Sequence, residues 1–390
     1  MKISMYAEDF KNITERAIMA AAKKGISSVT ESVLIETSGN KVTAKAYNLD
    51  YYAEITTDAV DVIEEGSIVI HRDNLKSLYN MKGRITLESE SKSAVKAGIV
   101  KSAKKTSRFF VQDKAEDFPL PSIGETQHAF TIKQSELLST MIKIKPYLFK
   151  GEQKPILKGV HIVGTEGLGT FYGCTGFFGI RQKIHGNFNT FKITIPEVSK
   201  ELKDVSGAKN NKQDCDITVT YDKKFVVYEG TDFKFVTRLI EGDYPNLENS
   251  FNATFTGSFD ADASEICTLA KEYKDILIHK TTTSKIVLPM VFTNVCGGLS
   301  TMALGNNIQT MDNLETADNI SISEEEYIQS FNPEYVEIVM KTLGKEEIHI
   351  DLQVALWRIN GNSDCSVLLV PMRTMPEDVE KIHSFVKSVA

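Results

Sequence analysis

The sequence predicts an α+β protein in which one unit of helices and antiparallel strands occurs three times. A strand that runs into an aromatic–proline turn appears at 108–119, ending in Asp117-Phe118-Pro119, and again at 234–245, ending in Asp243-Tyr244-Pro245. A short apolar strand followed by an amphipathic helix begins near 68, 193 and 329. Strands punctuated by helices favour helices packed on one face of an antiparallel sheet.

Each unit is predicted to contain two amphipathic helices, because apolar residues recur at three- and four-residue steps. We expect them at 8–24 and 72–81, at 133–149 and 198–205, and at 261–278 and 333–343. Asn332 is expected to cap the last helix, with Pro333 at its first position. Alternating segments around turn residues predict hairpins, for example 33–35 with 42–44 and 217–219 with 225–227.

The repeat sets the predicted domain boundaries near 124 and 253. Domains are therefore expected at 1–124, 125–253 and 254–373, each with two helices on an antiparallel sheet. The remaining 374–390 is expected to form a C-terminal helical extension. Its apolar residues fall on one helical face: Val379, Ile382, Phe385, Val386 and Val389.

Composition excludes several classes of protein. Of 390 residues, 42% are hydrophobic and 25% are charged, which is typical of a globular chain, and no apolar run reaches the roughly 18 residues of a membrane span. The N-terminus becomes acidic at Glu8 and Asp9, so we expect no secretory signal and a cytoplasmic protein. The five cysteines are far apart, which indicates reduced thiols and not a disulfide framework or a zinc site.

Charge alone argues against simple binding to nucleic acid, because the net charge is −7. Basic residues nevertheless lie off the apolar stripe of five of the six helices. Each is by itself more typical of a solvated face, but a cavity lined by all the helices would be positive. The residues predicted to face duplex DNA are Arg16, Lys23, Lys24, Lys76, Lys150, Lys154, Lys200 and Lys203.

Catalytic motifs are not found. The sequence contains no P-loop, dinucleotide-binding glycine motif, nucleophile elbow or zinc-protease motif. No histidine lies within four residues of another histidine or of a cysteine, and the glycine-rich stretch 173–179 lacks the lysine and the following helix of a phosphate-binding loop. We therefore expect that the protein is not an enzyme and that it has no cofactor and no metal site.

Several segments, in this order and spacing, resemble one known family. The segment 237–246, with its Tyr244-Pro245 pair, and the segment 367–373, which ends in Pro371-Met372-Arg373, are both similar to segments of that family. The segments 117–119, 157–160 and 193–196 also fit. Over residues 1–373 the chain resembles the bacterial DNA polymerase III β subunit, the β sliding clamp.

The resemblance implies the DNA-clamp fold and a head-to-tail homodimer. Six domains would form a ring with twelve helices around double-stranded DNA, bound without sequence specificity. For ring closure we expect the apolar edge strand that carries Phe109 and Val111 to pair with an edge of the second subunit near Ile276 and Ile278. Two alternatives stay open: an interaction protein with the same three-domain fold that forms no ring, and an enzyme with an unrecognised site.

The resemblance also implies a hydrophobic cleft that binds short peptides of DNA polymerase, the clamp loader and other proteins. By position, the cleft residues are Leu157, Thr175, Ile180, Pro245, Leu368, Val370, Pro371, Met372 and Arg373.

The chain departs from the family pattern in three places. Gly176-Phe177-Phe178-Gly179 replaces a run of Asp-Gly-His-Arg type, which makes the cleft wall more aromatic and less basic, and Asn249 replaces a common basic residue. The chain also continues beyond Arg373. Two placements are open for the extension: over the cleft, where Phe385 would compete with partner peptides, or as a strap on the outer surface of the third domain.

Overall fold

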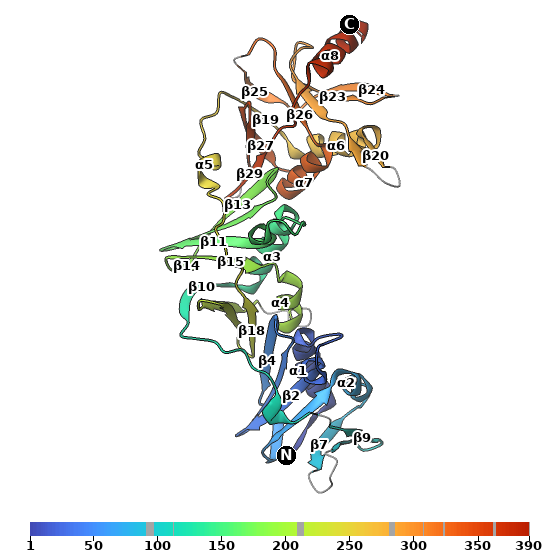
Figure 1. The fold of residues 1–390 in the computed structure, drawn as a ribbon, viewed down its shortest axis with the longest axis vertical. Coiled ribbons are helices and arrows are strands. Elements are labelled where there is room, and N and C mark those ends of the chain that lie inside the picture. Colours follow the sequence, from blue (N-terminus) through green and yellow to red (C-terminus); the bar gives the residue numbers. More distant parts are fainter. Residues whose placement is uncertain are drawn as a thin grey trace. The chain divides into compact units, whose positions relative to one another are not determined.

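The computed structural model describes residues 1–90, 97–111, 113–208, 214–280, 285–306, 308–322, 324–361 and 364–389 (Figure 1). The chain divides into two compact units. Unit 1 contains Met1–Ile142, Ile162–Gly169 and His185–Glu241, and unit 2 contains Lys143–His161, Thr170–Ile184 and Gly242–Ala390. Among the described residues, every helix is too short or too polar to cross a membrane.

Six helices lie where the periodicity predicts them: α1 Ala7–Ala17, α2 Arg72–Leu78, α3 Gln134–Ile144, α4 Ser199–Val205, α6 Ala263–Leu277 and α7 Pro333–Leu343. Each predicted domain contains two of them, and the threefold division itself stays a prediction. The Asn332 side chain accepts a hydrogen bond from the Glu334 amide at 2.9 Å, which confirms the cap of α7. The short helix α5, Glu248–Phe251, was not expected.

Two of the predicted helices were too long. Helix α1 ends at Ala17 and is followed by the 3₁₀ turn η1, Ile18–Ala20. Beyond this turn, Arg72 donates to the carbonyl oxygens of Ala21 and Ala22. Helix α3 is followed by the 3₁₀ turn η4, Lys145–Tyr147, because Pro146 has no amide proton to continue an α-helix. The remaining 3₁₀ turns are η2 Ser28–Glu31, η3 Ala115–Asp117 and η5 Pro155–Lys158.

Unit 1 contains two antiparallel sheets. The first has the order β5-β1-β7-β8-β9, with β5 Val60–Glu64, β1 Lys2–Tyr6, β7 Arg84–Glu90, β8 Ala97–Lys101 and β9 Thr106–Phe110. The second has the order β14-β10-β16-β17-β18-β4-β3-β2-β6, with β14 Asn187–Phe188, β10 Gln127–Lys133, β16 Asp216–Tyr221, β17 Phe225–Glu229, β18 Phe233–Arg238, β4 Tyr51–Thr57, β3 Lys41–Tyr47, β2 Ser32–Ser38 and β6 Ser67–His71. The predicted hairpins β2–β3 and β16–β17 are both confirmed.

Unit 2 contains a sheet that runs β12-β13-β29-β28-β27-β19-β25. Its strands are β12 Leu168–Cys174, β13 Phe178–His185, β29 Cys365–Leu369, β28 Leu356–Asn360, β27 Glu347–Gln353, β19 Gly257–Asp262 and β25 Asp318–Ser321. A four-stranded sheet has the order β24-β23-β22-β26, with β24 Gln309–Asn313, β23 Ser300–Leu304, β22 Met290–Thr293 and β26 Ile328–Phe331. Strands β20 Ile278–Lys280 and β21 Lys285–Val287 pair with each other, and the chain also forms β11 Gly159–Thr165 and β15 Phe191–Pro196.

One strand pairing occurs in both units and joins consecutive predicted domains. In unit 1, β18 pairs antiparallel with β4, and Thr237 lies opposite Tyr51. In unit 2, β29 pairs antiparallel with β13, and Leu369 lies opposite Phe178. The last strand of one predicted domain thus extends the sheet of the preceding one. We call β4–β18 and β13–β29 the two internal junctions.

The aromatic–proline elements of the repeat anchor the segments that follow the repeated strands. In unit 1, Phe118 lies in a buried cluster with Tyr52 of β4, Val236 of β18 and their neighbours. In unit 2, the ring of Tyr244 stacks on His161, with centroids 4.3 Å apart and planes 4° apart. In each unit the segment beyond the repeated strand therefore packs against the sheet of an internal junction.

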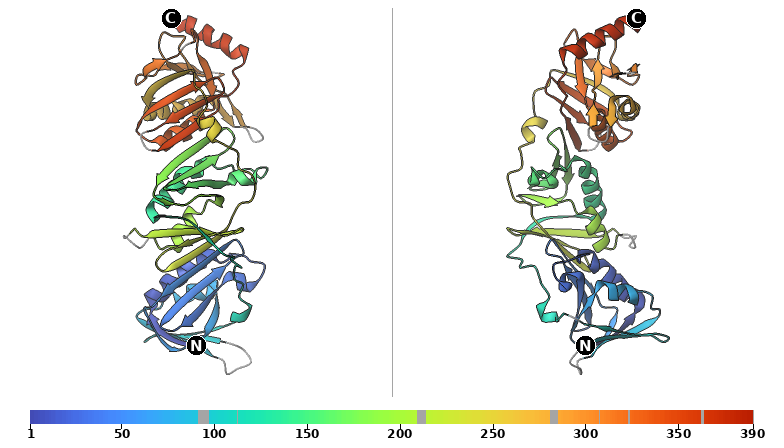
Figure 2. Two further views of the ribbon diagram at one scale, coloured as in Figure 1. Left: turned by 90° about the vertical axis from the view of Figure 1, so that its left-hand side faces the viewer. Right: turned by 45° about the vertical axis from the view of Figure 1, so that its right-hand side comes forward.

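The C-terminal extension forms helix α8, Pro376–Val389, which lies on the four-stranded sheet of unit 2 (Figures 1 and 2). Ile382 is fully buried with Val291 and Met302, and Phe385 and Val386 pack against the same cluster. The strap placement is therefore confirmed. The other placement left open, with Phe385 over the cleft, is wrong, because Phe385 packs on this sheet and Thr374 bonds to Ser330 of β26 just before α8 begins. The side chain of Val389 lies outside the described residues.

Candidate functional site

The segment 370–373, which we call the cleft segment, connects β29 to α8 and crosses between two strands of unit 2. The Val370 amide donates to the Phe177 carbonyl oxygen at 2.9 Å, and the Met372 amide donates to the Ser330 carbonyl oxygen at 2.7 Å. Val370 is 36% exposed, and Arg373 is exposed. The backbone is therefore fixed at both ends while several of its side chains can reach a ligand.

An aromatic wall lies beside the cleft segment. The Phe177 ring is 56% exposed and lies 5.8 Å from the Tyr335 ring, and the Phe178 ring lies 4.9 Å from the same tyrosine. Thr175 Oγ1 accepts hydrogen bonds from the Phe177 and Phe178 amides, both at 3.2 Å. Gly176 has φ +96°, which a residue with a side chain rarely adopts, so glycine permits the turn that presents Phe177.

The predicted cleft residues divide into a buried and an exposed group. Leu157, Ile180 and Leu368 are at most 4% exposed and contribute to packing. Thr175 shapes the turn. The exposed or partly exposed residues are Pro245, Val370, Pro371, Met372 and Arg373. Fewer residues are therefore accessible to a ligand than the nine that the family resemblance assigned to the cleft.

Pro245 is held in place by anchored neighbours. Tyr244 stacks on His161, and Arg181 pairs with Glu248 at 3.2 Å while its guanidinium lies 4.4 Å from the Phe251 ring centroid. Burial raises the pKa of Glu248, but the hydrogen bond from Tyr172 and the charge of Arg181 outweigh it and leave the pKa below its ordinary value. The carboxylate therefore stays ionised near neutral pH and fixes the segment that presents Pro245.

A hollow of about 360 Å³ lies on another side of the cleft segment. Among its lining residues are Tyr327, Ile328, Leu352, Val354, Pro371, Met372 and Arg373. Polar groups at the hollow are satisfied internally: Tyr327 donates to Gln329 at 2.7 Å, and Gln329 donates to the Gln353 carbonyl oxygen at 2.8 Å. A ligand here would meet apolar side chains together with one cation, Arg373, and one anion, Glu324, which suits an apolar peptide with polar groups at its edge.

The sequence analysis missed Tyr335 and Tyr327. Tyr335 lies on α7 next to the apolar stripe of Val336, Val339 and Met340, and a large aromatic residue off that stripe was the available signal. Tyr327 is 4% exposed and hydrogen-bonded to Trp357 at 3.1 Å, and nothing in its sequence neighbourhood indicated this contact.

Arg16 does not face outward, which corrects the prediction that it contacts DNA. Its guanidinium pairs with the Asp232 carboxylate at 2.6 and 2.8 Å, and its Nε donates to the Val205 carbonyl oxygen at 2.7 Å. The residue is only 7% exposed. Arg16 therefore ties α1 to the end of α4 and to the turn before β18.

We expect Arg16→Ala to lower the free energy of unfolding. The substitution removes a bidentate, charge-assisted contact, although the Asp232 side chain is 46% exposed and regains water. The expected loss is about 1–3 kcal/mol, measured by urea unfolding. Lys76→Ala is the control, because the Lys76–Asp73 pair is exposed at both ends. Equal stability of the two variants would contradict this role of Arg16.

The other residues predicted to face DNA are exposed. Lys76 lies on α2, and Lys200 and Lys203 lie on α4. The rest lie in loops and not on helices: Lys23 and Lys24 follow η1, and Lys150 and Lys154 lie between η4 and η5. Their freedom from buried contacts is compatible with binding to phosphates.

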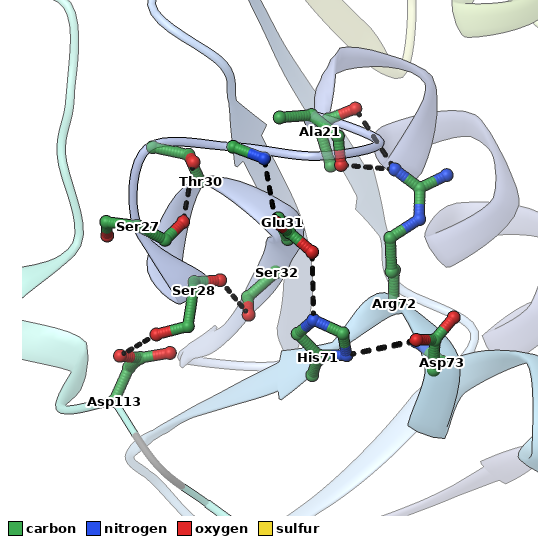
Figure 3. Close-up of polar contacts among 12 residues, drawn as sticks. Ala21, Ser27, Ser28, Thr30, Glu31, Ser32, His71, Arg72, Asp73 and Asp113 are labelled. Atoms are coloured by element: carbon green, nitrogen blue, oxygen red, sulfur yellow. Dashed lines mark hydrogen bonds and ion pairs between the residues drawn. The ribbon is translucent and has the colours of Figure 1, made fainter.

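The loop that carries Lys23 and Lys24 is held by a polar cluster (Figure 3). Arg72 donates to the Ala21 and Ala22 carbonyl oxygens before the two lysines, and the Gly25 amide donates to Glu31 at 2.7 Å after them. Glu31 Oε2 also lies 3.3 Å from His71 Nε2. The hydrogen bond from Gly25 is the main cause that lowers the pKa of Glu31. Both ends of the loop are therefore fixed while its lysines project into solvent.

Helices α1, α2 and α4 of unit 1 share one surface. A hollow of about 420 Å³ is lined by residues of α1, of α2 and of the end of α4, among them Arg72 and Lys76 together with Glu15 and Asp204. The surface is therefore mixed in charge, and weak binding to duplex DNA is the most that such a surface favours.

The sulfur and metal chemistry of the chain is limited. All five cysteines are free thiols, and burial raises the pKa of Cys365 to about 11. Within the described ranges, no three His, Cys, Asp or Glu side chains are grouped in a way that would hold a metal ion.

One residue of the predicted dimer interface has to be replaced. Strand β9 lies at the edge of its sheet, as expected, but Phe109 is 8% exposed and the space beside Gly98 is filled by its ring. Phe110 is 65% exposed and replaces Phe109 as the residue available for contact. Ile276 packs beside Gly305 in the turn before β24, and Ile278 lies in β20 opposite Val287.

Comparisons with known proteins agree with this architecture. No family model matches the chain. The curated β sliding clamp of Streptococcus pneumoniae (strain ATCC BAA-255 / R6) is 22% identical over 383 residues, covering 93% of this chain and 96% of the relative. The DNA polymerase sliding clamp of Bacillus subtilis has a TM-score of 0.80 at 17% identity, with 96% of this chain and 100% of that chain covered. The sliding clamp of Bartonella birtlesii bound to griselimycin has a TM-score of 0.77 at 17% identity, with the same coverage.

The chain thus has the α+β sliding-clamp fold, which confirms the predicted fold class. In sequence the chain is similar to the β sliding clamp of Streptococcus pneumoniae, and in structure it shares the fold of the solved sliding clamps.

Proposed function

We propose that two copies of this chain close head to tail into a ring around double-stranded DNA and keep a DNA polymerase on its template. The proposal assigns no catalytic step, cofactor or metal to the chain and places it in the cytoplasm. The fold of the sliding clamps supports it, and the observation that carries it is a pair of unfilled strand edges that match the two internal junctions.

The two edges are β9 in unit 1 and β24 in unit 2. Three hairpins contain a turn in which the first amide donates to the carbonyl oxygen three residues on: Asn48 to Tyr51, Thr175 to Phe178, and Gly305 to Ile308. The same bond closes the turns 102–105, 222–225 and 230–233, so the strand that follows each turn is what distinguishes the three. The first two hairpins lead into β4 and β13, which pair with β18 and β29 at the internal junctions. The third leads into β24, which ends the order β24-β23-β22-β26.

The internal junctions supply a register for the ring. Tyr51 lies opposite Thr237, and Phe178 lies opposite Leu369. The repeated strand puts Val111 in the place of Thr237, and the repeated turn puts Ile308 in the place of Tyr51. We therefore expect Val111 of one copy opposite Ile308 of the other, with Phe110 opposite Gln309. This refines the predicted interface from the neighbourhood of Ile276 to strand β24.

The mass in solution tests this step directly. Sedimentation of the full chain at micromolar concentration is expected to give a dimer, twice the chain mass of 43.4 kDa. A chain that is monomeric under these conditions would favour the alternative, an interaction protein of the same fold that forms no ring.

For the partners, we propose that the polymerase, the clamp loader and other proteins bind through short peptides at the cleft segment and the aromatic wall of Phe177 and Tyr335. Support comes from the exposed side chains of the cleft segment and from the hollow beside Met372. The aromatic wall in this chain suits a partner peptide with an apolar or aromatic side chain.

Griselimycin is the ligand of the solved Bartonella birtlesii clamp, and we propose it as a probe for this surface. We expect Phe177→Ala to weaken its binding about tenfold, because an exposed ring that contacts a ligand typically contributes 1–2 kcal/mol. Ile63→Ala, at a side chain that is 61% exposed on β5 and belongs neither to the cleft segment nor to the hollow, is the control for a generic loss of apolar surface. Calorimetry measures both. Tight binding unaffected by Phe177→Ala would contradict the aromatic wall.

A further inference from the structure

At both internal junctions, the segment that follows the repeated strand packs against the sheet. The cluster around β4–β18 contains Phe118 from the segment after β9, with Tyr52, Phe225 and Val236 from the paired strands. Near β13–β29, Tyr244 stacks on His161 of β11, and Tyr172 of β12 donates to Glu248 in the segment after β18. A covered sheet face therefore accompanies this strand pairing in both units.

Helix α8 covers the four-stranded sheet β24-β23-β22-β26 in the way that the other two segments cover the sheets of the internal junctions. It follows β29, as the other two segments follow β9 and β18, and it covers the sheet that ends in β24. Met311 of β24 packs against the cluster that contains Ile382, and Phe385 packs against the same cluster. Asp312 lies on the opposite face, where Tyr273 of α6 donates to it at 2.6 Å. Helix α8 thus lies on the Met311 face of the edge strand.

Phe110 belongs on this same face in the expected register. Its counterpart at the internal junction is Val236, which is 1% exposed in the cluster with Tyr52 and Phe118. Tyr52 corresponds to Gln309, which shares a strand face with Met311. Phe110 is 65% exposed in the single chain and has no such cover.

We propose that α8 is a clasp for ring closure: its apolar face and Met311 form the surface on which Phe110 of a second copy is buried. The inference rests on the proposed ring and adds to it the role of the extension. It predicts that the C-terminal helix stabilises the interface between copies and does not regulate the peptide cleft.

A double-mutant cycle on the full chain tests the contact. Phe385→Ala and Phe110→Ala are expected each to raise the dimer dissociation constant by about tenfold or more. Because the two rings are expected to belong to one cluster, the double variant should be weakened about 3- to 10-fold less than the product of the single effects. Sedimentation equilibrium measures the four constants. Ile320→Ala, at an exposed residue of β25, is the control variant.

Folding is checked separately, since Phe385 also stabilises its own sheet. Phe110→Asp is expected to be monomeric. Comparing its thermal midpoint with that of the Phe110→Asp, Phe385→Ala double variant therefore measures how much Phe385 stabilises its own chain. A dimer whose dissociation constant is unchanged by Phe385→Ala, or effects that multiply fully in the double variant, would overturn the clasp and leave the ring intact. A parent chain that never dimerises would overturn the ring itself.

Discussion

Phe110→Asp is expected to raise the dimer dissociation constant at least a hundredfold. Phe110 lies on the edge strand β9, is 65% exposed, and corresponds to the buried Val236 of the internal junction. The substitution removes roughly 1.5–3 kcal/mol of apolar burial and adds the cost of burying a carboxylate against the partner sheet. Sedimentation velocity across a concentration series should show monomers where the parent chain is dimeric.

Two further variants make this result specific. Phe109→Asp is a poor test, because the Phe109 ring packs on Gly98 inside its own sheet and the change would damage folding. Ile286→Asp on β21 distinguishes a ring that closes through β24 from one that closes through β20–β21. Ile286 is 53% exposed and lies opposite His279 of β20, so its substitution should disrupt a ring closed through β20–β21 but not one closed through β24. Dimers that survive Phe110→Asp but not Ile286→Asp would contradict the proposed register.

Replacing Lys23, Lys24, Lys150 and Lys154 by serine is expected to produce the largest change in DNA binding. Each side chain is exposed and lies in a loop. Each phosphate contact contributes about 0.9 to the slope of log affinity against log salt concentration, so the slope should fall by as much as about 4. Fluorescence anisotropy with a linear duplex at several salt concentrations measures it. The free energy of unfolding should change little, because these positions are solvated.

A second set of four lysines, in strands and in a hairpin turn, serves as the control. Lys41 of β3, Lys192 of β15, and Lys223 and Lys224 of the turn between β16 and β17 are also exposed, and their loss changes the net charge by the same amount. An equal loss of affinity in both sets would indicate a general effect of charge and would contradict a specific DNA-facing surface. A high-affinity, sequence-specific site on the parent chain would contradict the sliding function.

Periodicity predicted the helices well where a local signal also set their ends. Helix α7 begins at Pro333 because Asn332 and Pro333 are a local capping pair, and both are visible in the sequence. The segment expected to continue α1 instead leaves the helix after η1, and Arg72 binds its Ala21 and Ala22 carbonyl oxygens across the fold. A contact of this kind cannot be found from neighbouring residues.

Contacts between distant segments also explain why the prediction that Arg16 faces DNA was wrong. Its place off the apolar stripe of α1 correctly excludes it from the apolar core, but its ion-pair partner Asp232 lies 216 residues away. The sequence pattern distinguishes apolar from polar faces, and it does not distinguish a polar face in solvent from one that binds another segment.

The extension shows what amphipathicity can and cannot specify. The stripe of Ile382, Phe385 and Val386 correctly predicts a docked helix. The surface it covers follows from the tertiary structure, where Thr374 joins β26 before the helix begins. The cleft itself stays a prediction, made by matching positions to the resembling family. The aromatic wall could not be predicted in this way, because it depends on contact between Phe177 and Tyr335 of the distant helix α7.

Covalent closure of the expected ring on DNA tests the central claim most directly. At the internal junction, the Thr56 amide donates to the Asp232 carbonyl oxygen at 2.9 Å, so the Tyr51–Thr237 pair is of the non-hydrogen-bonded kind. The equivalent pair, Val111 and Ile308 of the second copy, should have Cα atoms about 4.5 Å apart, which suits a disulfide. Val111→Cys with Ile308→Cys, in a background with Cys215 and Cys296 replaced by serine, is oxidised in the presence of closed circular DNA.

The account predicts a covalent dimer that stays on the circle in detergent and is released when the DNA is cut or the disulfides are reduced. Linear DNA of the same length should retain none, and Val111→Cys with Asp312→Cys, which is out of register, should cross-link poorly. Efficient cross-linking without retention on the circle, or equal retention on linear DNA, would contradict a ring that encircles duplex DNA.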